Sequence, residues 1–201
     1  AHAKRQFCLR WSCRVSKQNI PMKTKSARIT SAGRPNVGKS TLTNALVGEK
    51  IAIVSNKPQT TRNRICAVVN RENTQLVFID TPGFHRPRTK LGDYMVNVVK
   101  ESVADVDAVI LMVDPIANVG EQEHALLDQI RASGAPATLV INKIDPAEKE
   151  ALLPVIAAYQ QEFAFDAVTP ISAKWRDGVT APLSECATYD HPGPLPFPAD
   201  M

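Results

Sequence analysis

The sequence lacks the features of a membrane-spanning, secreted or metal-scaffolded chain. No apolar run approaches the ~18–20 residues that a helix needs to cross a bilayer, and the longest, Ala108–Val113, has the length of a buried strand. The first 21 residues contain no apolar core of the kind that secretory signals carry. The four cysteines form no CxxC pair and no metal-binding spacing, so reduced thiols are expected. Because these classes are excluded, we expect an ordinary globular domain.

Acidic residues are absent from residues 1–28, which contain eight lysines and arginines. Subtracting these leaves sixteen basic and twenty acidic side chains in residues 29–201, a net charge of −4. The positive net charge therefore belongs to the amino-terminal segment and does not predict a nucleic-acid surface on the domain. We expect residues 1–26 to form a basic, unstructured extension. Met22 is interpreted as the natural start, and an organelle transit peptide or a basic arm that touches RNA or anionic lipid are the alternatives.

Beyond the extension, strand and helix patterns alternate along the chain. The rhythm predicts an α/β fold with a doubly wound, mostly parallel, six-stranded sheet and helices on both faces. The domain is expected to span residues 27–190, and the prolines of residues 191–201 predict an extended tail. Strands are expected at 27–32, 65–70, 75–79, 108–113, 137–141 and 168–171. Helices are expected at 39–47, 91–102, 120–133, 147–163 and 179–190.

Two features of this pattern are unfavourable for the stability of the predicted fold. Arg28, Thr30 and Ser31 are polar in a strand that should lie in the middle of the sheet. Pro154 and Pro182 are expected to interrupt the last two helices, because proline removes a backbone donor. Reduced stability is the expectation from both.

The first chemical motif is G-R-P-N-V-G-K-S at residues 33–40, a complete GxxxxGK[ST] phosphate-binding loop between a predicted strand and a predicted helix. Its glycines let successive backbone N–H groups point inward and, with the helix N-terminus, cradle phosphate oxygens. Lys39 is expected to reach the β and γ phosphates, and the Ser40 hydroxyl to ligate Mg²⁺. The predicted nucleotide contacts in this segment are Gly33, Asn36, Val37, Gly38, Lys39, Ser40 and Thr41.

The second motif, D-T-P-G, directly follows the strand expected at 75–79. Asp80 is expected to hold Mg²⁺ through water, and the Gly83 N–H to meet the γ-phosphate, so that the loop beyond it senses hydrolysis. Thr81 and Pro82 complete the predicted contacts. Although such a sequence is also a good turn, the phosphate loop upstream favours the functional interpretation.

A polar segment at residues 58–62, P-Q-T-T-R, lies between the first helix and the second strand. One of its threonines is expected to ligate Mg²⁺ when GTP is bound and to release it afterwards. We choose Thr61, with Thr60 as the alternate. Lys39, Thr61 and Gly83 are thus the predicted catalytic groups, and the predicted metal ligands are Ser40, Thr61 and Asp80.

Two motifs near the carboxyl ends of later strands predict a guanine reader. In N-K-I-D at residues 142–145, the Asp145 carboxylate can accept hydrogen bonds from guanine N1–H and the N2 amine, a donor pair that adenine lacks. Asn142 is expected to support the base and the loop, and the Lys143 stem to cover the ring. In S-A-K at residues 172–174, the Ala173 N–H is expected to bond guanine O6, with Ser172 and Lys174 beside it. Trp175 is bulky for the position after this loop.

These residues resemble the Era-like GTPases, in the group that also holds the tRNA-modifying and tandem-domain ribosome-assembly GTPases. The resemblance covers residues 29–178 well and continues faintly to L-P-F-P-A-D-M at 195–201. It is carried by GRPNVGKSTLTNALVGEK (33–50), KPQTTRNRI (57–65), FIDTPGFHRPRTKLGDYM (78–95), NKID (142–145) and PISAK (170–174).

The resemblance implies a monomeric, cytoplasmic, Mg²⁺-dependent molecular switch that binds GTP and GDP, hydrolyses GTP and serves in assembly of the small ribosomal subunit. The family's second domain is a KH module that binds the 3′ region of small-subunit ribosomal RNA, with peripheral membrane contact as a further expectation. The KH module is absent from this sequence, so the RNA-binding half cannot be carried over. The tail at 191–201 is expected to lead toward it.

The mechanism has one gap, which concerns the attacking water. Phe84 follows Gly83 and cannot orient water as a glutamine does, so a slow intrinsic rate is expected. A K⁺ ion held with the help of Asn36 is our hypothesis for the missing positive charge, and an asparagine that only shapes the loop is the alternative. The competing functions are a nucleotide-binding module with negligible turnover, a P-loop kinase, against which N-K-I-D argues, and a nonfunctional fragment.

Overall fold

The fold is given by a computed structural model, which describes residues 24–48, 65–71, 73–81, 103, 106–145 and 149–198. The strands are β1 (Lys25–Gly33), β2 (Ile65–Arg71), β3 (Thr74–Asp80), β4 (Ala108–Val113), β5 (Ala137–Ile141), β6 (Ala167–Pro170) and β7 (His191–Pro192). The helices are α1 (Lys39–Val47), α3 (Glu121–Ser133), η1 (Lys149–Ala151), α4 (Leu152–Glu162), α5 (Thr180–Cys186) and η2 (Ala187–Tyr189). The helix expected at 91–102 lies outside the described residues.

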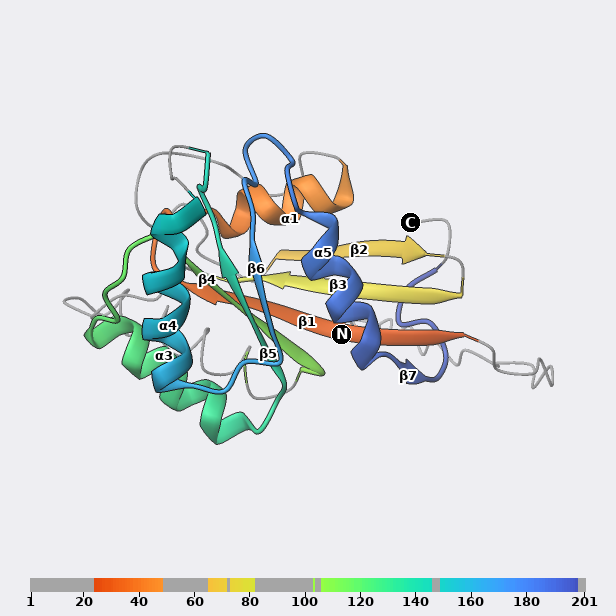
Figure 1. The fold of residues 1–201 in the computed structure, drawn as a ribbon. Coiled ribbons are helices and arrows are strands. Elements are labelled where there is room, and N and C mark those ends of the chain that lie inside the picture. The colour runs from red at the N-terminus through yellow and green to blue at the C-terminus, as the bar shows by residue number, and fades with distance from the viewer. Residues whose placement is uncertain are drawn as a thin grey trace, which may run out of the picture.

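One twisted sheet joins all the described strands (Figure 1), in the order β2-β3-β1-β4-β5-β6 with β7 paired to β1. β1, β3, β4, β5 and β6 run parallel, whereas β2 is antiparallel to β3. The chain order reverses beside β1, and such a switch point is where open α/β sheets bind ligands, at the carboxyl ends of the strands. The mostly parallel, six-stranded prediction is confirmed for the main path, and the two-residue β7 is an addition that the sequence pattern did not predict.

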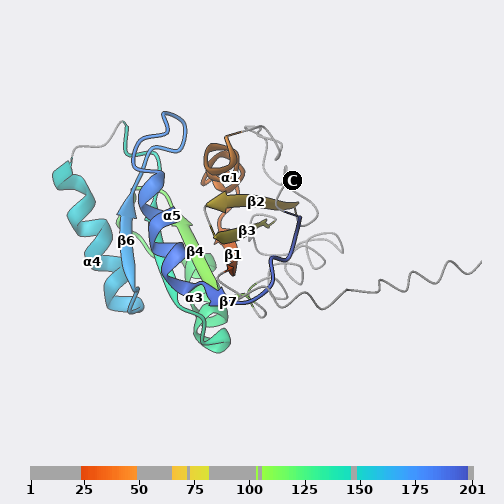
Figure 2. The same cartoon turned by 90° about the vertical axis from the view of Figure 1, so that its right-hand side faces the viewer.

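Helices cover both faces of the sheet (Figures 1 and 2), as the doubly wound prediction requires. The strand β4 shows how one short run serves both faces, because its side chains alternate. Ala108, Ile110 and Met112 pack into the core under α1 and α5. Val109, Leu111 and Val113 pack into the core under α3 and α4. No helix in the described ranges is both long and apolar enough to span a bilayer.

The polar residues of β1 are accommodated in the centre of the sheet through specific hydrogen bonds. Thr30 is fully buried, and its hydroxyl lies 3.4 Å from the Ile79 carbonyl oxygen. Ser31 is also buried, and its hydroxyl lies 3.5 Å from the Asp80 carboxylate at the end of β3. Buried polar groups of this kind are tolerated when they are paired, so the polarity of β1 follows from its neighbours at the carboxyl end of β3.

The two prolines start helices instead of breaking them. Pro154 is the third residue of α4 and Pro182 the third residue of α5. The first four N–H groups of a helix have no intrahelical partner, so a proline in that turn loses no helical hydrogen bond. The helix expected at 147–163 therefore begins at residue 152 after a short 3-10 turn, and the one expected at 179–190 ends in another 3-10 turn.

The proline-rich tail is docked on the amino-terminal ends of the central strands. β7 pairs antiparallel with the start of β1, with Lys25 opposite Pro192 and Ser26 opposite His191. Thr24 and Gly193 then exchange hydrogen bonds of 2.8 and 3.1 Å. Extended backbone was expected from the prolines, but this pairing was not.

Candidate functional site

The phosphate-binding loop connects the end of β1 to the start of α1 at the switch point of the sheet. Two of its glycines cannot be replaced without a collision. A Cβ on Gly33 would overlap the Met112 carbonyl oxygen of β4, and a Cβ on Gly38 would overlap the Asn142 side-chain amide. Gly38 also has φ 105°, in the left-handed region that favours glycine. The loop therefore lies directly against the ends of the neighbouring strands.

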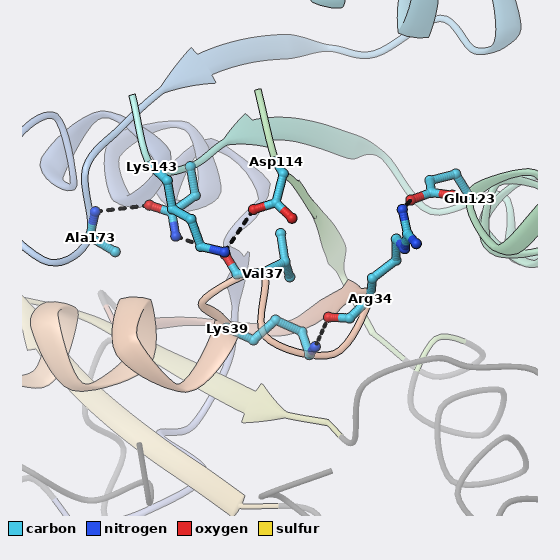
Figure 3. A network of polar contacts seen from close by, with 8 residues as sticks. Arg34, Val37, Lys39, Asp114, Glu123, Lys143 and Ala173 are labelled. Carbon is cyan, nitrogen blue, oxygen red and sulfur yellow. Dashed lines mark hydrogen bonds and ion pairs between the residues drawn. The ribbon is translucent and has the colours of Figure 1, made fainter. Parts of the chain in front are cut away.

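Lys39 projects into the centre of this loop (Figure 3). Its ammonium donates to the carbonyl oxygens of Gly33 at 3.1 Å and Arg34 at 2.9 Å. The residue is only 6% exposed, and burial lowers the pKa of Lys39 to about 8, although the Asp80 carboxylate opposes this shift. A desolvated ammonium whose present partners are two neutral carbonyls is well placed to exchange them for phosphate oxygens.

A hydroxyl and a carboxylate meet beside the loop where a metal ion is predicted. Ser40 Oγ, at the start of α1, donates to Asp80 Oδ2 at 2.7 Å, and Asp80 is fully buried at the end of β3. Ser31 Oγ lies 3.5 Å from the other carboxylate oxygen. Mg²⁺ prefers oxygen ligands and is held in nucleotide sites by few protein groups plus water and phosphate. This donor set fits Mg²⁺, with Ser40 and Asp80 as the residues that would hold it.

Asn142 joins the phosphate loop to the predicted base loop. Its side-chain amide donates to the Val37 carbonyl oxygen at 2.8 Å, and its Oδ1 accepts from the Ala173 backbone N–H at 2.9 Å. The residue is buried, and both contacts cross between elements that are far apart in the sequence. Through these two hydrogen bonds, Asn142 connects the phosphate loop at Val37 to the predicted base loop at Ala173.

The predicted base reader lies exposed at the rim. The Ser172 hydroxyl donates to Asp145 Oδ1 at 2.7 Å, and this bond is the main reason that the pKa of Asp145 is lowered. The carboxylate is therefore ionised at neutral pH and able to accept hydrogen bonds. Lys143 has a left-handed φ of 63°, and its ammonium forms a 2.9 Å ion pair with Asp114 at the end of β4 (Figure 3).

Sequence reasoning missed a buried acidic residue behind the phosphate loop. Glu123 of α3 is 3% exposed, and one carboxylate oxygen lies 3.4 Å from the Arg34 guanidinium (Figure 3). Its Oε2 has no hydrogen-bond partner within the part of the chain that the structure describes. Burial and the nearby Glu123 raise the pKa of Tyr159 on α4. The available signal was that Glu123 shares a helical face with the apolar residues Leu126, Leu127 and Ile130.

The structure brings most of the predicted site residues to the carboxyl edge of the sheet. Val37 and Thr81 are buried there, whereas Asn36 has a left-handed φ of 64° and is exposed. The predicted residues that the structure places at this edge are Gly33, Asn36, Val37, Gly38, Lys39, Ser40, Thr41, Asp80, Thr81, Asn142, Lys143, Asp145, Ser172, Ala173 and Lys174. The predicted groups Thr60, Thr61, Pro82, Gly83 and Phe84 lie outside the described residues.

Comparison with protein families decides the wider relationship. Residues 28–143, more than half of the chain, match the family described as 50S ribosome-binding GTPase. The chain belongs to this GTPase family. The matched segment starts in β1 and ends at Lys143, so it includes the phosphate loop, Asp80 and the start of N-K-I-D.

Individual family members share more of the chain. GTPase Era of Ruminiclostridium cellulolyticum is 45% identical over 180 residues, which make up 90% of this chain and 60% of that protein. A crystal structure of Era in complex with MgGDPNP and nucleotides 1506–1542 of 16S ribosomal RNA has a TM-score of 0.83 at 33% identity, covering 89% of this chain and 61% of that one. A crystal structure of an Aquifex aeolicus Era variant bound to GDP·AlF₄⁻ matches equally well. The chain thus spans about 60% of the length of these relatives.

Proposed function

We propose that this chain binds GTP and GDP with Mg²⁺ and hydrolyses GTP to GDP and phosphate, as a molecular switch. The observation that supports this best is the double contact of Asn142, which holds the phosphate loop at Val37 and the base loop at Ala173. A phosphate cradle alone would fit many nucleotides. A cradle tied to an ionised Asp145 presents a hydrogen-bond acceptor to the donor edge of guanine, and the Ala173 N–H, which donates to Asn142, lies in the neighbouring loop.

The chain's own residues supply electrostatic stabilisation of phosphoryl transfer. Lys39 and the N–H groups at the start of α1 offer positive charge where the phosphates would lie. Mg²⁺, when bound, neutralises charge that develops on the phosphate oxygens. Thr61 and the Gly83 N–H complete our proposal as the groups that respond to the γ-phosphate. Since Phe84 cannot orient water, hydrolysis without a partner is expected to be slow.

A K⁺ ion is the finer part of the cofactor proposal. We propose that Asn36 helps to hold K⁺ beside the phosphates, where the ion supplies the positive charge that an arginine finger supplies elsewhere. Asn36 lies in the phosphate loop with a left-handed φ, which places it on the exposed rim of the loop. Equal hydrolysis rates in KCl and NaCl at matched ionic strength would contradict this part alone.

The biological role that we propose is that of the relatives. The Era structure with 16S ribosomal RNA supports a switch in assembly of the small ribosomal subunit. We further propose that the chain acts in the cytoplasm as a monomer, with peripheral membrane contact as a further expectation. The chain spans about 60% of the length of these relatives, so RNA binding by this chain stays a part of the proposal. The guanine-nucleotide site can be tested without RNA.

Titration with fluorescent GDP, GTP and ADP analogues in Mg²⁺ buffer tests the binding proposal, and phosphate release from GTP tests hydrolysis. We expect guanine-selective binding and slow release. Absence of guanine binding by a chain that melts cooperatively would overturn the proposal. Tight binding without measurable release would instead support the alternative, a binding module with negligible turnover, which Phe84 favours.

A further inference from the structure

Glu123 occupies a position on α3 where an apolar residue would ordinarily lie. It is only 3% exposed, and the residues three, four and seven positions later, Leu126, Leu127 and Ile130, are buried on the same helical face. Removing a carboxylate from water is unfavourable unless the charge is paired. A glutamate at this place therefore needs a partner, and the structure provides one in the phosphate loop.

The partner is Arg34, whose guanidinium lies 3.4 Å from Glu123 Oε1. The other carboxylate oxygen, Oε2, has no hydrogen-bond partner among the described residues, and a Cβ on Gly120 would come within 3.0 Å of it. Gly120 has φ −86°, which any residue can adopt, so its backbone does not require glycine. The absence of a side chain at Gly120 instead leaves room for the carboxylate.

Arg34 also holds Lys39, through its backbone. The Arg34 carbonyl oxygen accepts a 2.9 Å hydrogen bond from the Lys39 ammonium (Figure 3). Pro35 follows, and a residue before proline is restricted to extended backbone, which limits the directions that this carbonyl can take. Gly33 precedes it and has no side chain that could anchor the loop. The Arg34 side chain thus connects this part of the loop to α3.

We propose that Glu123 is a positioning residue of the phosphate site, which acts through the Arg34 guanidinium to fix the carbonyl oxygen that holds Lys39. The helix that carries Glu123 is packed in the core, so the carboxylate gives the loop a firm point of attachment. A loop that is held in place before the nucleotide arrives loses less conformational freedom on binding. Glu123 has this effect without touching the nucleotide.

A purely structural role for Glu123 makes a different prediction. A carboxylate in the first turn of a helix is stabilised by the helix dipole, and Glu121 lies in the same turn of α3. If Glu123 served only the helix, its removal would leave GDP affinity unchanged or weaken it irrespective of Lys39. A positioning role requires instead that the effect of Glu123 on GDP depends on Lys39.

Titration of GDP into wild type, E123Q, K39A and K39A/E123Q measures this dependence. Glu123→Gln keeps the shape of the side chain and removes its charge. We expect E123Q to bind GDP about fivefold more weakly than wild type, whereas K39A/E123Q should differ from K39A by less than about twofold. An equal loss in both backgrounds, or no loss from wild type to E123Q, would overturn the positioning role.

A double variant keeps the test valid if the single substitution disturbs folding. Arg34→Gln together with Glu123→Gln removes both charges, so that neither is left unpaired. This variant should bind GDP about as weakly as E123Q, because both lack the same ion pair. Binding as tight as that of wild type would contradict the proposal.

Glu121→Gln is the matched control, since Glu121 is an exposed acidic residue in the same turn of α3. E121Q should leave GDP affinity unchanged, and a loss equal to that of E123Q would assign the effect to the charge at the helix end. The positioning role presupposes that the chain binds GDP. If wild type binds GDP and E123Q binds it equally well, the role of Glu123 is wrong and the proposed function stands. If wild type binds no GDP, the proposed function itself fails.

Discussion

The two ends of the central strands use buried polar groups in opposite ways. At the carboxyl ends, the Lys39 ammonium rests on two backbone carbonyls and Ser40 rests on Asp80. At the amino ends, the fully buried Gln75 of β3 donates to Asn70 at 2.9 Å and to the Phe197 carbonyl at 3.2 Å, and it accepts from the Phe197 N–H at 2.8 Å. The groups at the carboxyl ends can exchange their partners for a ligand, whereas Gln75 at the amino ends holds the carboxyl-terminal tail against the sheet.

This difference explains why burial of a polar residue does not by itself indicate function. The partners of Gln75 are backbone groups of the same chain and an adjacent amide, so the site is complete. The hydrogen-bond partners that the structure describes for Lys39 are two neutral backbone carbonyls, and the Asp80 carboxylate acts on it through its charge without accepting a hydrogen bond from it. Substitutions at the carboxyl end should therefore change binding, and those at the amino end should change stability.

Lys39→Ala should produce the largest effect on binding. Removing charge-assisted contacts to phosphates should weaken GDP about 100-fold. The free energy of unfolding should change by no more than ~1 kcal/mol, because the lost hydrogen bonds are offset by relief of a buried charge. Calorimetric titration and urea unfolding measure the two quantities. If K39A lost stability in proportion to its loss of GDP affinity, the proposed difference between the two ends of the strands would be contradicted.

Gln75→Ala should produce the reverse pattern. It removes the three part-buried hydrogen bonds of a fully buried residue and should lower the free energy of unfolding by ~2–3 kcal/mol, with no change in GDP affinity. Hydrogen exchange should show lost protection at Phe197. Asn70→Ala removes one of the three contacts and serves as the milder control. Unchanged exchange at Phe197 in Q75A would show that the tail is held by other contacts.

Binding should take up protons near pH 8. The folded, nucleotide-free protein loses the Lys39 proton at about pH 8, whereas the unfolded chain keeps it to about 10.5. The free-energy cost of burying the charged Lys39 side chain is therefore fully present below pH 8 and disappears as the pH rises toward 10.5. The free energy of unfolding should accordingly increase with pH between these two values. Phosphate charge favours the ammonium, and GDP binding at pH 8 should take up about half a proton.

Calorimetry in two buffers of different ionisation enthalpy measures that uptake. Lys39→Arg, whose guanidinium does not titrate in this range, should abolish it. Identical binding heats in the two buffers with wild type would mean that Lys39 takes up no proton when GDP binds at pH 8, which would contradict this prediction.

Lys25→Ala should have the smallest effect. The Lys25–Asp190 ion pair is short, at 2.9 Å, but the lysine side chain is 49% exposed. Exposed pairs contribute ~0.2–1 kcal/mol, so the melting temperature should fall only slightly, and less in high salt. A drop as large as that of Q75A would mean that the charge pair, and not Gln75, closes this end of the sheet.

Local patterns in the sequence were sufficient for much of this architecture. The continuous apolar run of β4, Gly48 at the end of α1 and the order of the phosphate, metal and base motifs each depend on neighbouring residues, so they can be recognised without the fold. The polarity of β1 was misleading, because the hydrogen-bond partner of Thr30 is 49 positions away. Pro154 and Pro182 were expected to interrupt their helices, but each lies in the first turn of a helix that begins two residues before it. The helices were therefore predicted correctly, and the error concerned their boundaries.

The remaining features depend on tertiary contacts that no local pattern encodes. Arg34 and Glu123 come together only because α3 passes behind the phosphate loop. Gln75 and Phe197 are 122 positions apart, and neither belongs to a motif.

Asp145→Asn, titrated with guanosine and xanthosine diphosphates, tests the central claim most directly. An asparagine amide offers a donor where the carboxylate accepts, and xanthine carries a carbonyl where guanine carries its amine. We expect GDP affinity to fall about 100-fold, while xanthosine diphosphate binds the variant more tightly than it binds wild type. Unchanged GDP affinity in a correctly folded D145N would contradict the assignment of the guanine site.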